Sequence, residues 1–176
     1  ATTRGPSTGR LDRDEPLANP ARPTRGNAMQ HVREEIRVEA PIEHVWKFYC
    51  DTSNWPDFLP RARFSDFSGP VDEVGTTYVQ SMKLMGFEMK QNVEIVEVEP
   101  QRLIHEHSDS WSMDNYFRFE PDGDATRVVF ESDWTMPGKI PGAIKDMATK
   151  GWMERNTRNI VADFKALAEA KVPAHA

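Results

Sequence analysis

The stretch "APIEHVWKFYCDTSNWPDFLP", residues 40–60, contains two short helical segments separated by a polar break. Apolar residues follow the three- and four-residue spacing of one helical face up to Tyr49, and Pro41 stands where the first turn of a helix accepts proline. The polar run at 51–54 ends this pattern, because short polar side chains bond to nearby backbone, and a second helix is expected to begin near Trp55. Two short helices joined by a bend are suited to closing one side of a curved structure.

Strand patterns lie on both sides of this stretch. Residues 31–38 alternate between a mostly apolar and a polar face, which predicts a strand with one buried side. Six further strands are predicted downstream, at 62–66, 76–85, 88–99, 102–109, 112–120 and 126–136. The segments between them are short and carry turn signals such as Ser-Gly-Pro and Pro-Asp-Gly-Asp. Neighbouring strands are therefore expected to be antiparallel.

A long helix is predicted at 143–170, after a segment rich in proline and glycine. Its apolar stripe consists of Met153, Thr157, Ile160, Phe164 and Leu167, with Val161 and Ala168 beside it. The order is thus one strand, two short helices, six strands and a long helix. This order predicts an α+β fold in which a seven-stranded curved antiparallel sheet wraps around the long helix, and such an arrangement commonly leaves a cavity.

Composition excludes several classes of function. The 176 residues allow one domain with its own core, and the net charge of −6 argues against a nucleic-acid partner. A single cysteine allows no internal disulfide and no zinc site built from several thiolates. No apolar run reaches the ~20 residues of a membrane span, so stable membrane insertion is not expected. We expect a soluble cytoplasmic monomer or homodimer with no cofactor.

Residues 1–28 differ in composition from the rest of the chain. They contain four prolines, three glycines and five arginines but no aromatic residue. Such a segment cannot bury enough apolar surface to offset the entropy of ordering it, so a flexible tail is predicted, followed by one domain at 29–172. Two alternatives stay open for the tail: a basic arm that docks on the acidic body or on a neighbouring subunit, and a leader that precedes Met29.

Several stretches together resemble the START-like, pollen-allergen-like helix-grip superfamily, also called SRPBCC. They are "APIEHVW", "DTSNWPDFLP", "VEIVEVEPQRLIHEH", "FRFEPDGDATRVVFESDW" and the closing amphipathic helix, so that the resemblance covers about residues 31–170. Within the superfamily the chain is most similar to bacterial polyketide cyclase/dehydrase-type domains and to coenzyme Q-binding proteins. The resemblance implies a deep apolar pocket between the sheet and the final helix that binds lipids, polyketides or other hydrophobic small molecules.

Strand alternation predicts which side chains face this pocket, because every second residue of a strand lies on the same side. The candidate ligand-binding residues are Trp55, Tyr78, Met82, Met89, Gln91, His105, Met113, Asn115, Phe117, Ser132, Trp134, Met153, Asn156 and Ile160. Most of them are expected to be packing residues as well. Gln91, Asn115 and Ser132 stand out as polar groups on apolar faces, which need a partner from one another, the backbone, water or a ligand. A structural partner is favoured over a ligand for each.

No catalytic constellation is evident in the sequence. His105 and His107 share one strand face and could supply two metal ligands, but no third ligand accompanies them, so no metal site is expected. Either histidine could act as a general acid or base if it faces the pocket. Cys50 ends an apolar helix and is predicted to be a small hydrophobic residue rather than a nucleophile. The sequence contains no nucleophile elbow, phosphate loop or dinucleotide fingerprint.

The sequence differs from polyketide aromatase/cyclases on one strand. Those proteins tend to place Trp, Ser and Arg on the strand that leads into the Glu-Pro turn, whereas "QNVEIVEVEP" offers valine and isoleucine. The helical stretch "MERNTRNI", residues 153–160, does resemble those cyclases and would bring Asn156 close to the pocket. The cyclase hypothesis thus lacks its usual cationic anchor.

Three hypotheses follow. The first is a carrier or sensor of a hydrophobic small molecule. The second is a polyketide cyclase/aromatase or dehydratase that acts in the same cavity and uses His105, Asn115 or Tyr78 for proton transfer. The third is a coenzyme Q-type lipid-quinone chaperone, suggested by the resemblance of "NWPDFLP" to coenzyme Q-binding proteins.

Overall fold

A computed structural model describes residues 29–84, 87–135 and 142–172. Its single sheet has seven antiparallel strands in the order β1-β7-β6-β5-β4-β3-β2. The strands are β1 (Gln30–Val38), β2 (Ala62–Ser65), β3 (Thr77–Leu84), β4 (Phe87–Glu99), β5 (Leu103–Ser108), β6 (Met113–Asp122) and β7 (Ala125–Trp134). The helices are α1 (Ile42–Cys50), α2 (Trp55–Phe58) and α3 (Gly142–Ala170), with 3-10 turns η1 (Thr52–Asn54) and η2 (Asp109–Trp111). The predicted α+β helix-grip architecture is confirmed.

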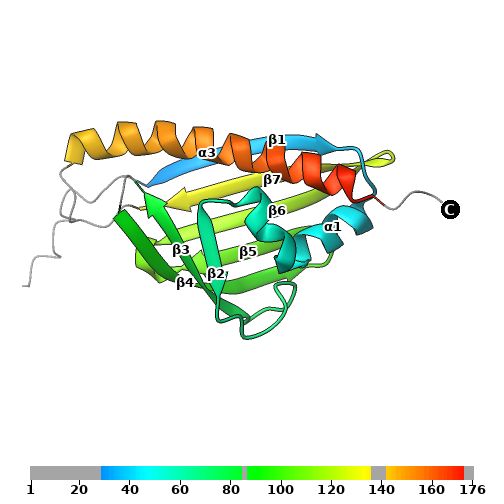
Figure 1. Cartoon of the computed structure of the whole chain (residues 1–176), viewed down its shortest axis with the longest axis horizontal. Helices are drawn as coiled ribbons and strands as arrows, with labels where there is room; N and C mark the ends of the chain where they lie inside the picture. The colour runs from blue at the N-terminus through cyan, green and yellow to red at the C-terminus, as the bar shows by residue number, and fades with distance from the viewer. Residues whose placement is uncertain (1–28, 85–86, 136–141, 173–176) are drawn as a thin grey trace, which may run out of the picture.

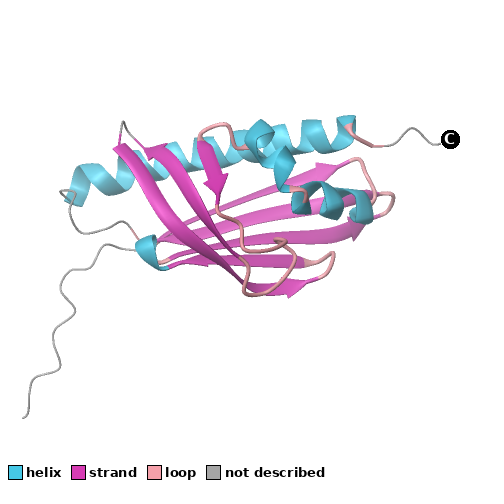
Figure 2. Cartoon of the chain, turned by 60° about the horizontal axis from the view of Figure 1, so that its bottom comes forward, coloured by secondary structure: helices cyan, strands magenta, loops and turns pink. Residues whose placement is uncertain are grey.

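Six of the strands form a meander in which each follows its neighbour along the chain, and β1 joins the sheet beside β7. All three α-helices lie on the same side of the sheet (Figure 2), and α3 runs along the length of the molecule (Figure 1). The long strand β4 carries an irregularity between Ile95 and Glu97, where Val96 is left exposed. A bulge of this kind bends a strand and so helps a sheet to curve.

Residues 40–60 fold as two helical pieces with a bend, as predicted. The ends and lengths of the two pieces differ from the prediction. Pro41 is the N-cap residue of α1 with an extended backbone, and α2 is a single turn preceded by the 3-10 turn η1. The Asp51 carboxylate accepts hydrogen bonds from the Ser53 backbone N–H at 3.1 Å and from its hydroxyl at 2.6 Å. The Trp55 indole N–H then donates to the Tyr49 carbonyl at 2.7 Å, which fixes the second piece against the first.

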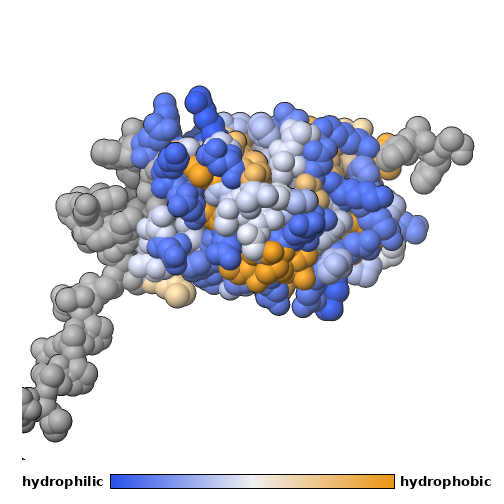
Figure 3. Space-filling model, turned by 90° about the horizontal axis from the view of Figure 1, so that it is seen from below, coloured by the Kyte–Doolittle hydropathy of each residue, from blue (hydrophilic) through white to orange (hydrophobic). Residues whose placement is uncertain are grey.

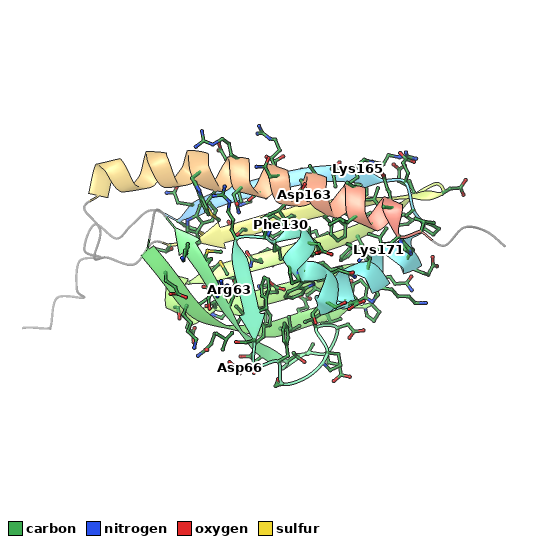
Figure 4. The ribbon with its side chains drawn as sticks, in the orientation of Figure 1. Arg63, Asp66, Phe130, Asp163, Lys165 and Lys171 are labelled. Carbon is green, nitrogen blue, oxygen red and sulfur yellow. The ribbon has the colours of Figure 1, made fainter. Side chains whose placement is uncertain are left out.

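Helix α3 packs on the sheet through the predicted stripe. Thr157, Val161, Phe164 and Ala168 are buried, and the neighbouring members of the stripe are partly buried. Polar contacts also join α3 to the end of the edge strand β1: Lys165, labelled in Figure 4, donates from Nζ to the backbone carbonyl of Arg37 at 2.6 Å. Glu169 accepts from the backbone N–H of residue 39, just after β1, at 2.7 Å.

An aromatic cluster joins α1, α2, α3 and the sheet, with ring centroids 4.4–6.5 Å apart around Tyr49. Such aromatic contacts contribute beyond the area that they bury. Several rings of this cluster, Tyr49 and Trp55 among them, also line the cavity described below.

The outer surface gives few clues to function. Figure 3 shows a face that is largely hydrophilic with a limited hydrophobic area. Among the described residues, the large hydrophobic side chains that are exposed are Met29, Phe67, Val74 and Val96. No helix within the described residues has the length and apolar character needed to cross a membrane.

The predicted tail at 1–28 and the end of the predicted strand at Met136 lie outside the described residues. The division into tail and domain stays a prediction.

Candidate functional site

A cavity of about 270 Å³ lies between the sheet and α3. Its walls come from α1, α2, β2, β3, β5, β6, β7 and α3. Ten of the predicted residues line it: Trp55, Tyr78, Met82, Met113, Asn115, Phe117, Ser132, Met153, Asn156 and Ile160. Their placement follows from strand alternation and from the helical stripe, because both patterns continue without a slip through these elements.

Two other predicted residues are buried but do not line the cavity. Gln91 is buried, and its amide donates to Gln80 Oε1 at 2.7 Å and contacts Met113 Sδ at 3.8 Å. It therefore contacts two residues that line the cavity without lining the cavity itself. Trp134 is buried in a separate cluster with Val32, Met113, Phe130 and Val161. The prediction for Met89 concerns a side chain that lies outside the described part of the structure.

The prediction for His105 is corrected, because this ring lies on the outer face of the sheet. Its Nε2 is 2.8 Å from Asp114 Oδ1, and its ring stacks on Tyr116 with centroids 4.2 Å apart. His107 Nδ1 approaches the same carboxylate oxygen at 2.9 Å. The two histidines do share a face, as predicted, but that face is turned away from the cavity, so neither can transfer protons there.

Glu106 is a buried cavity residue that was not among the residues predicted from the sequence. It lies between the two histidines on β5, and its side chain therefore points to the opposite, inner face, where it lines the cavity while only 4% exposed. Tyr49 Oη donates to Glu106 Oε1 at 3.0 Å, and Asn115 Nδ2 donates to Oε2 at 3.3 Å. Tyr78 also bonds to this carboxyl group.

The environment of Glu106 favours the uncharged acid. Burial raises the pKa of the Glu106 carboxyl, and the hydrogen bonds from Tyr49, Asn115 and Tyr78 only partly oppose this shift. The pKa of both tyrosines is raised well above 10, chiefly by burial and then by the nearby Glu106 carboxylate. Both phenols therefore keep their protons and act as hydrogen-bond donors.

Glu106 belongs to a row of polar side chains that crosses three strands. It is paired with Asn115 on β6, and Asn115 is paired with Ser132 on β7. All three side chains are buried and line the cavity, whereas the cavity residues around them are mostly apolar. The Ser132 hydroxyl has no hydrogen-bonding partner among the described residues.

The segment that joins α2 to β2 and the middle of α3 complete the wall. Leu59, Pro60 and Arg61 lie on the first, and Asn159 and Asp163 lie on the second. Figure 4 shows Asp163 on α3 and Phe130, another lining residue, on β7 beneath the helix. Arg61 is exposed, and it is the one basic side chain that lines the cavity within the described ranges.

Metal binding and thiol chemistry find no support in the described part of the chain. It contains no cluster of three or more His, Cys, Asp or Glu side chains arranged to hold a metal ion. Cys50 packs against the core, and burial, followed by the charge of Asp72, raises the pKa of its thiol to about 12. A thiol with such a pKa stays protonated at neutral pH and is a poor nucleophile.

The missed residue did leave a signal in the sequence. Ile104, Glu106 and Ser108 share one parity of β5, and all three are buried. Alternation places Glu106 on the same face as Ile104, so the side of the sheet that buries Ile104 also receives this carboxylate. No sequence pattern marks Tyr49 or Arg61 as a cavity residue, because the position of each side chain depends on how the bend after α1 directs the chain.

Fold and cavity together define a helix-grip domain with an internal cavity. Specifically, the chain belongs to the family described as "Polyketide cyclase / dehydrase and lipid transport", whose model matches residues 29–169. No match was found among curated proteins.

Solved structures share this fold at low identity. The Zhui aromatase/cyclase from Streptomyces sp. R1128 is 19% identical with a TM-score of 0.68, over 84% of this chain and 98% of that chain. The protein TTHA0849 from Thermus thermophilus is 18% identical with a TM-score of 0.66, over 82% and 100%. A START superfamily protein from Mycobacterium smegmatis is 13% identical with a TM-score of 0.63, over 81% and 99%. At these identities the likeness shows a common fold.

Proposed function

We propose that the protein binds a hydrophobic small molecule of lipid, polyketide or isoprenoid type in the cavity between sheet and α3. The observation that carries the proposal is a space of about 270 Å³ whose wall contains many aromatic and thioether side chains, together with polar side chains from the sheet, from α3 and from the segment before β2. Ligand sites in proteins commonly combine apolar walls with a few placed polar groups. The family description, which includes both polyketide chemistry and lipid transport, supports the same class of ligand.

Native mass spectrometry of the purified protein, followed by organic extraction, tests this proposal. We expect a bound fatty acid, isoprenoid quinone or polyketide, and its identity separates the carrier hypothesis from the coenzyme Q-type hypothesis. Asn156→Trp places a large ring in the cavity and should abolish binding, because Asn156 lines the wall on α3. Ala162→Trp puts the same ring on the exposed side of the same helix and should bind as the unaltered protein does. Equal ligand content in both variants would refute binding in this cavity.

Catalysis in the same cavity is the second candidate, and Glu106 favours it. A buried carboxyl with a raised pKa, held by two tyrosines, is a suitable general acid or base for the cyclisation or dehydration of a bound polyketide. This role was predicted for His105, Asn115 or Tyr78, and His105 is now excluded by its position. The test is incubation with a linear β-polyketone thioester and mass analysis for loss of water. Glu106→Gln should abolish that loss while binding persists, and no water loss from the unaltered protein would leave the carrier function alone.

A further inference from the structure

The two ends of the polar row Glu106, Asn115 and Ser132 differ in their hydrogen bonding, and this difference affects which ligands the cavity accepts. Asn115 Nδ2 donates to Glu106 Oε2 at 3.3 Å, and Glu106 Oε1 receives the Tyr49 hydroxyl at 3.0 Å. The Glu106 carboxyl is thus held by donors from α1, β3 and β6. At the other end of the row, Ser132 on β7 is completely buried and its hydroxyl has no partner among the described residues.

A buried hydroxyl without a partner is costly, and in most proteins such a group is satisfied. Ser132 lines the cavity, so a polar atom of a bound molecule is one source of the missing bond. The hydroxyl of serine can donate and accept, and therefore matches a ligand hydroxyl, enol or ketone.

The charges around the row select against an anionic group. Arg61, the basic residue in the described wall of the cavity, is exposed and precedes β2, an edge strand that the sheet order separates from β5, β6 and β7 by β3 and β4. A ligand carboxylate beside the row would be desolvated and would have no cation as a partner. If Glu106 is ionised, it would also repel the anion. If Glu106 is protonated, it can donate one hydrogen bond, which does not offset the cost of burying a full negative charge.

We propose that the Glu106-Asn115-Ser132 row is a subsite for a neutral hydroxyl, enol or ketone oxygen of the ligand, that Ser132 supplies the hydrogen bond to it, and that the subsite rejects carboxylates. This inference rests on the proposed function, because it concerns the ligand class of the same cavity. It places the ligand among phenols, alcohols and ketones carried on an apolar ring or chain, and it excludes fatty acids bound with their carboxylate at the row.

Three ring compounds of one shape test the subsite: naphthalene, 1-naphthol and 1-naphthoate, with affinities measured by calorimetry at pH 7. Naphthol should bind at least about tenfold more tightly than naphthoate, which must bury an unpaired charge. Ser132→Ala should weaken naphthol by about three- to tenfold and leave naphthalene unchanged, because a hydrogen bond of ordinary strength is lost. Ser108→Ala is the matched control, since Ser108 is also buried and unpartnered within the described ranges but does not line the cavity.

The outcomes separate the two proposals. If naphthalene and naphthol bind equally, if naphthoate binds as tightly as naphthol, or if Ser132→Ala leaves naphthol binding unchanged, the subsite is refuted while the cavity stands. If none of the three compounds binds, the proposed ligand-binding function itself fails. A loss of naphthol affinity in Ser108→Ala equal to that in Ser132→Ala would also refute the subsite, because the effect would then be a general one on the sheet.

Discussion

Glu106 on β5 and Asp114 on β6 lie on opposite faces of the sheet, and these two carboxylates behave in opposite ways. On the inner face, burial raises the pKa of Glu106. On the outer face, burial of Asp114 acts in the same direction, but hydrogen bonds from His107 and His105 outweigh it and lower the pKa of Asp114. The partners account for the difference: Glu106 has neutral donors in a buried site, whereas Asp114 has two imidazoles that can carry positive charge.

This difference shows how one pair of strands separates two kinds of site. The outer cluster is a partly solvated network that can exchange protons with water and contributes little to stability. The inner cluster is tied to the packing of the aromatic core through Tyr49 and to the cavity through Asn115. Changes on the inner face should therefore affect folding and ligand binding together, and changes on the outer face should affect neither strongly.

The largest expected contrast is between two tyrosines. Tyr49→Ala should lower the free energy of unfolding by about 3–5 kcal/mol, because the ring is buried among Trp55, Phe117 and Phe119 and leaves a cavity when removed. Tyr116→Ala on the outer face should cost about 1 kcal/mol or less, since it loses two partly exposed contacts, the stacking on His105 and the contact with the Arg118 guanidinium. Urea denaturation measures both, and similar losses would contradict the contrast.

The next effect isolates the hydroxyl of Tyr49. Tyr49→Phe keeps the ring and removes the donor to Glu106, so we expect a loss of about 1–3 kcal/mol at pH 7. The loss should shrink in acid, where Glu106 is protonated and needs fewer donors. Tyr116→Phe serves as the control and should be close to neutral. A loss independent of pH would mean that the hydroxyl does not interact with an ionising group.

The pH dependence of stability gives the third test. Because the pKa of Glu106 is higher in the folded protein than its ordinary value of 4.5, the folded state binds this proton more tightly than the unfolded chain does. The stabilising contribution is present below 4.5 and is lost as the pH rises through the folded pKa, by up to about 1.4 kcal/mol per pH unit. Glu106→Gln should remove this slope. The idea fails if both proteins show the same dependence between pH 4 and pH 8 in denaturant titrations.

The smallest effect concerns the outer cluster. Hydrogen bonds to Asp114 and then to Asp109 raise the pKa of His107, so its stabilising contribution is complete below 6.5 and fades as the pH rises through the folded pKa. Asp114→Asn should return the pKa of His107 toward 6.5 while changing stability by less than about 1 kcal/mol. Histidine ring signals in NMR titrations report this directly. An unchanged pKa would show that Asp114 is not the partner of His107.

Most of the fold could be predicted from the sequence because its patterns are regular. Alternation placed Met113, Asn115 and Phe117 on one face of β6, and the structure confirms this placement because β6 and β7 pair without irregularity. Helical spacing likewise placed Thr157 and Phe164 against the sheet. The one-turn length of α2 was not predictable, since it depends on the hydrogen bond from Trp55 to Tyr49 and on packing across the bend.

The site was predicted less completely, for a physical reason. His105 is a conspicuous candidate in the sequence because imidazole titrates near neutrality, whereas the single carboxylate between two histidines is not. Alternation alone makes the face of Glu106 opposite to that of His105, but which face is buried depends on the neighbouring strands β4 and β6. The donors Tyr49 and Tyr78 come from elements distant in sequence, so their convergence on Glu106 needs the three-dimensional fold.

The contacts between α3 and β1 have a consequence for assembly. β1 is an edge of the sheet, and an open edge offers unpaired backbone groups to which a second chain could add a strand. Lys165 and Glu169 occupy a carbonyl and an N–H group in this region of the backbone, and the body of the helix lies alongside. The edge at the other side, β2, has four residues. The helix that encloses the cavity thus also occupies backbone groups at the Arg37 end of this edge, which leaves fewer of them for a second chain to pair with.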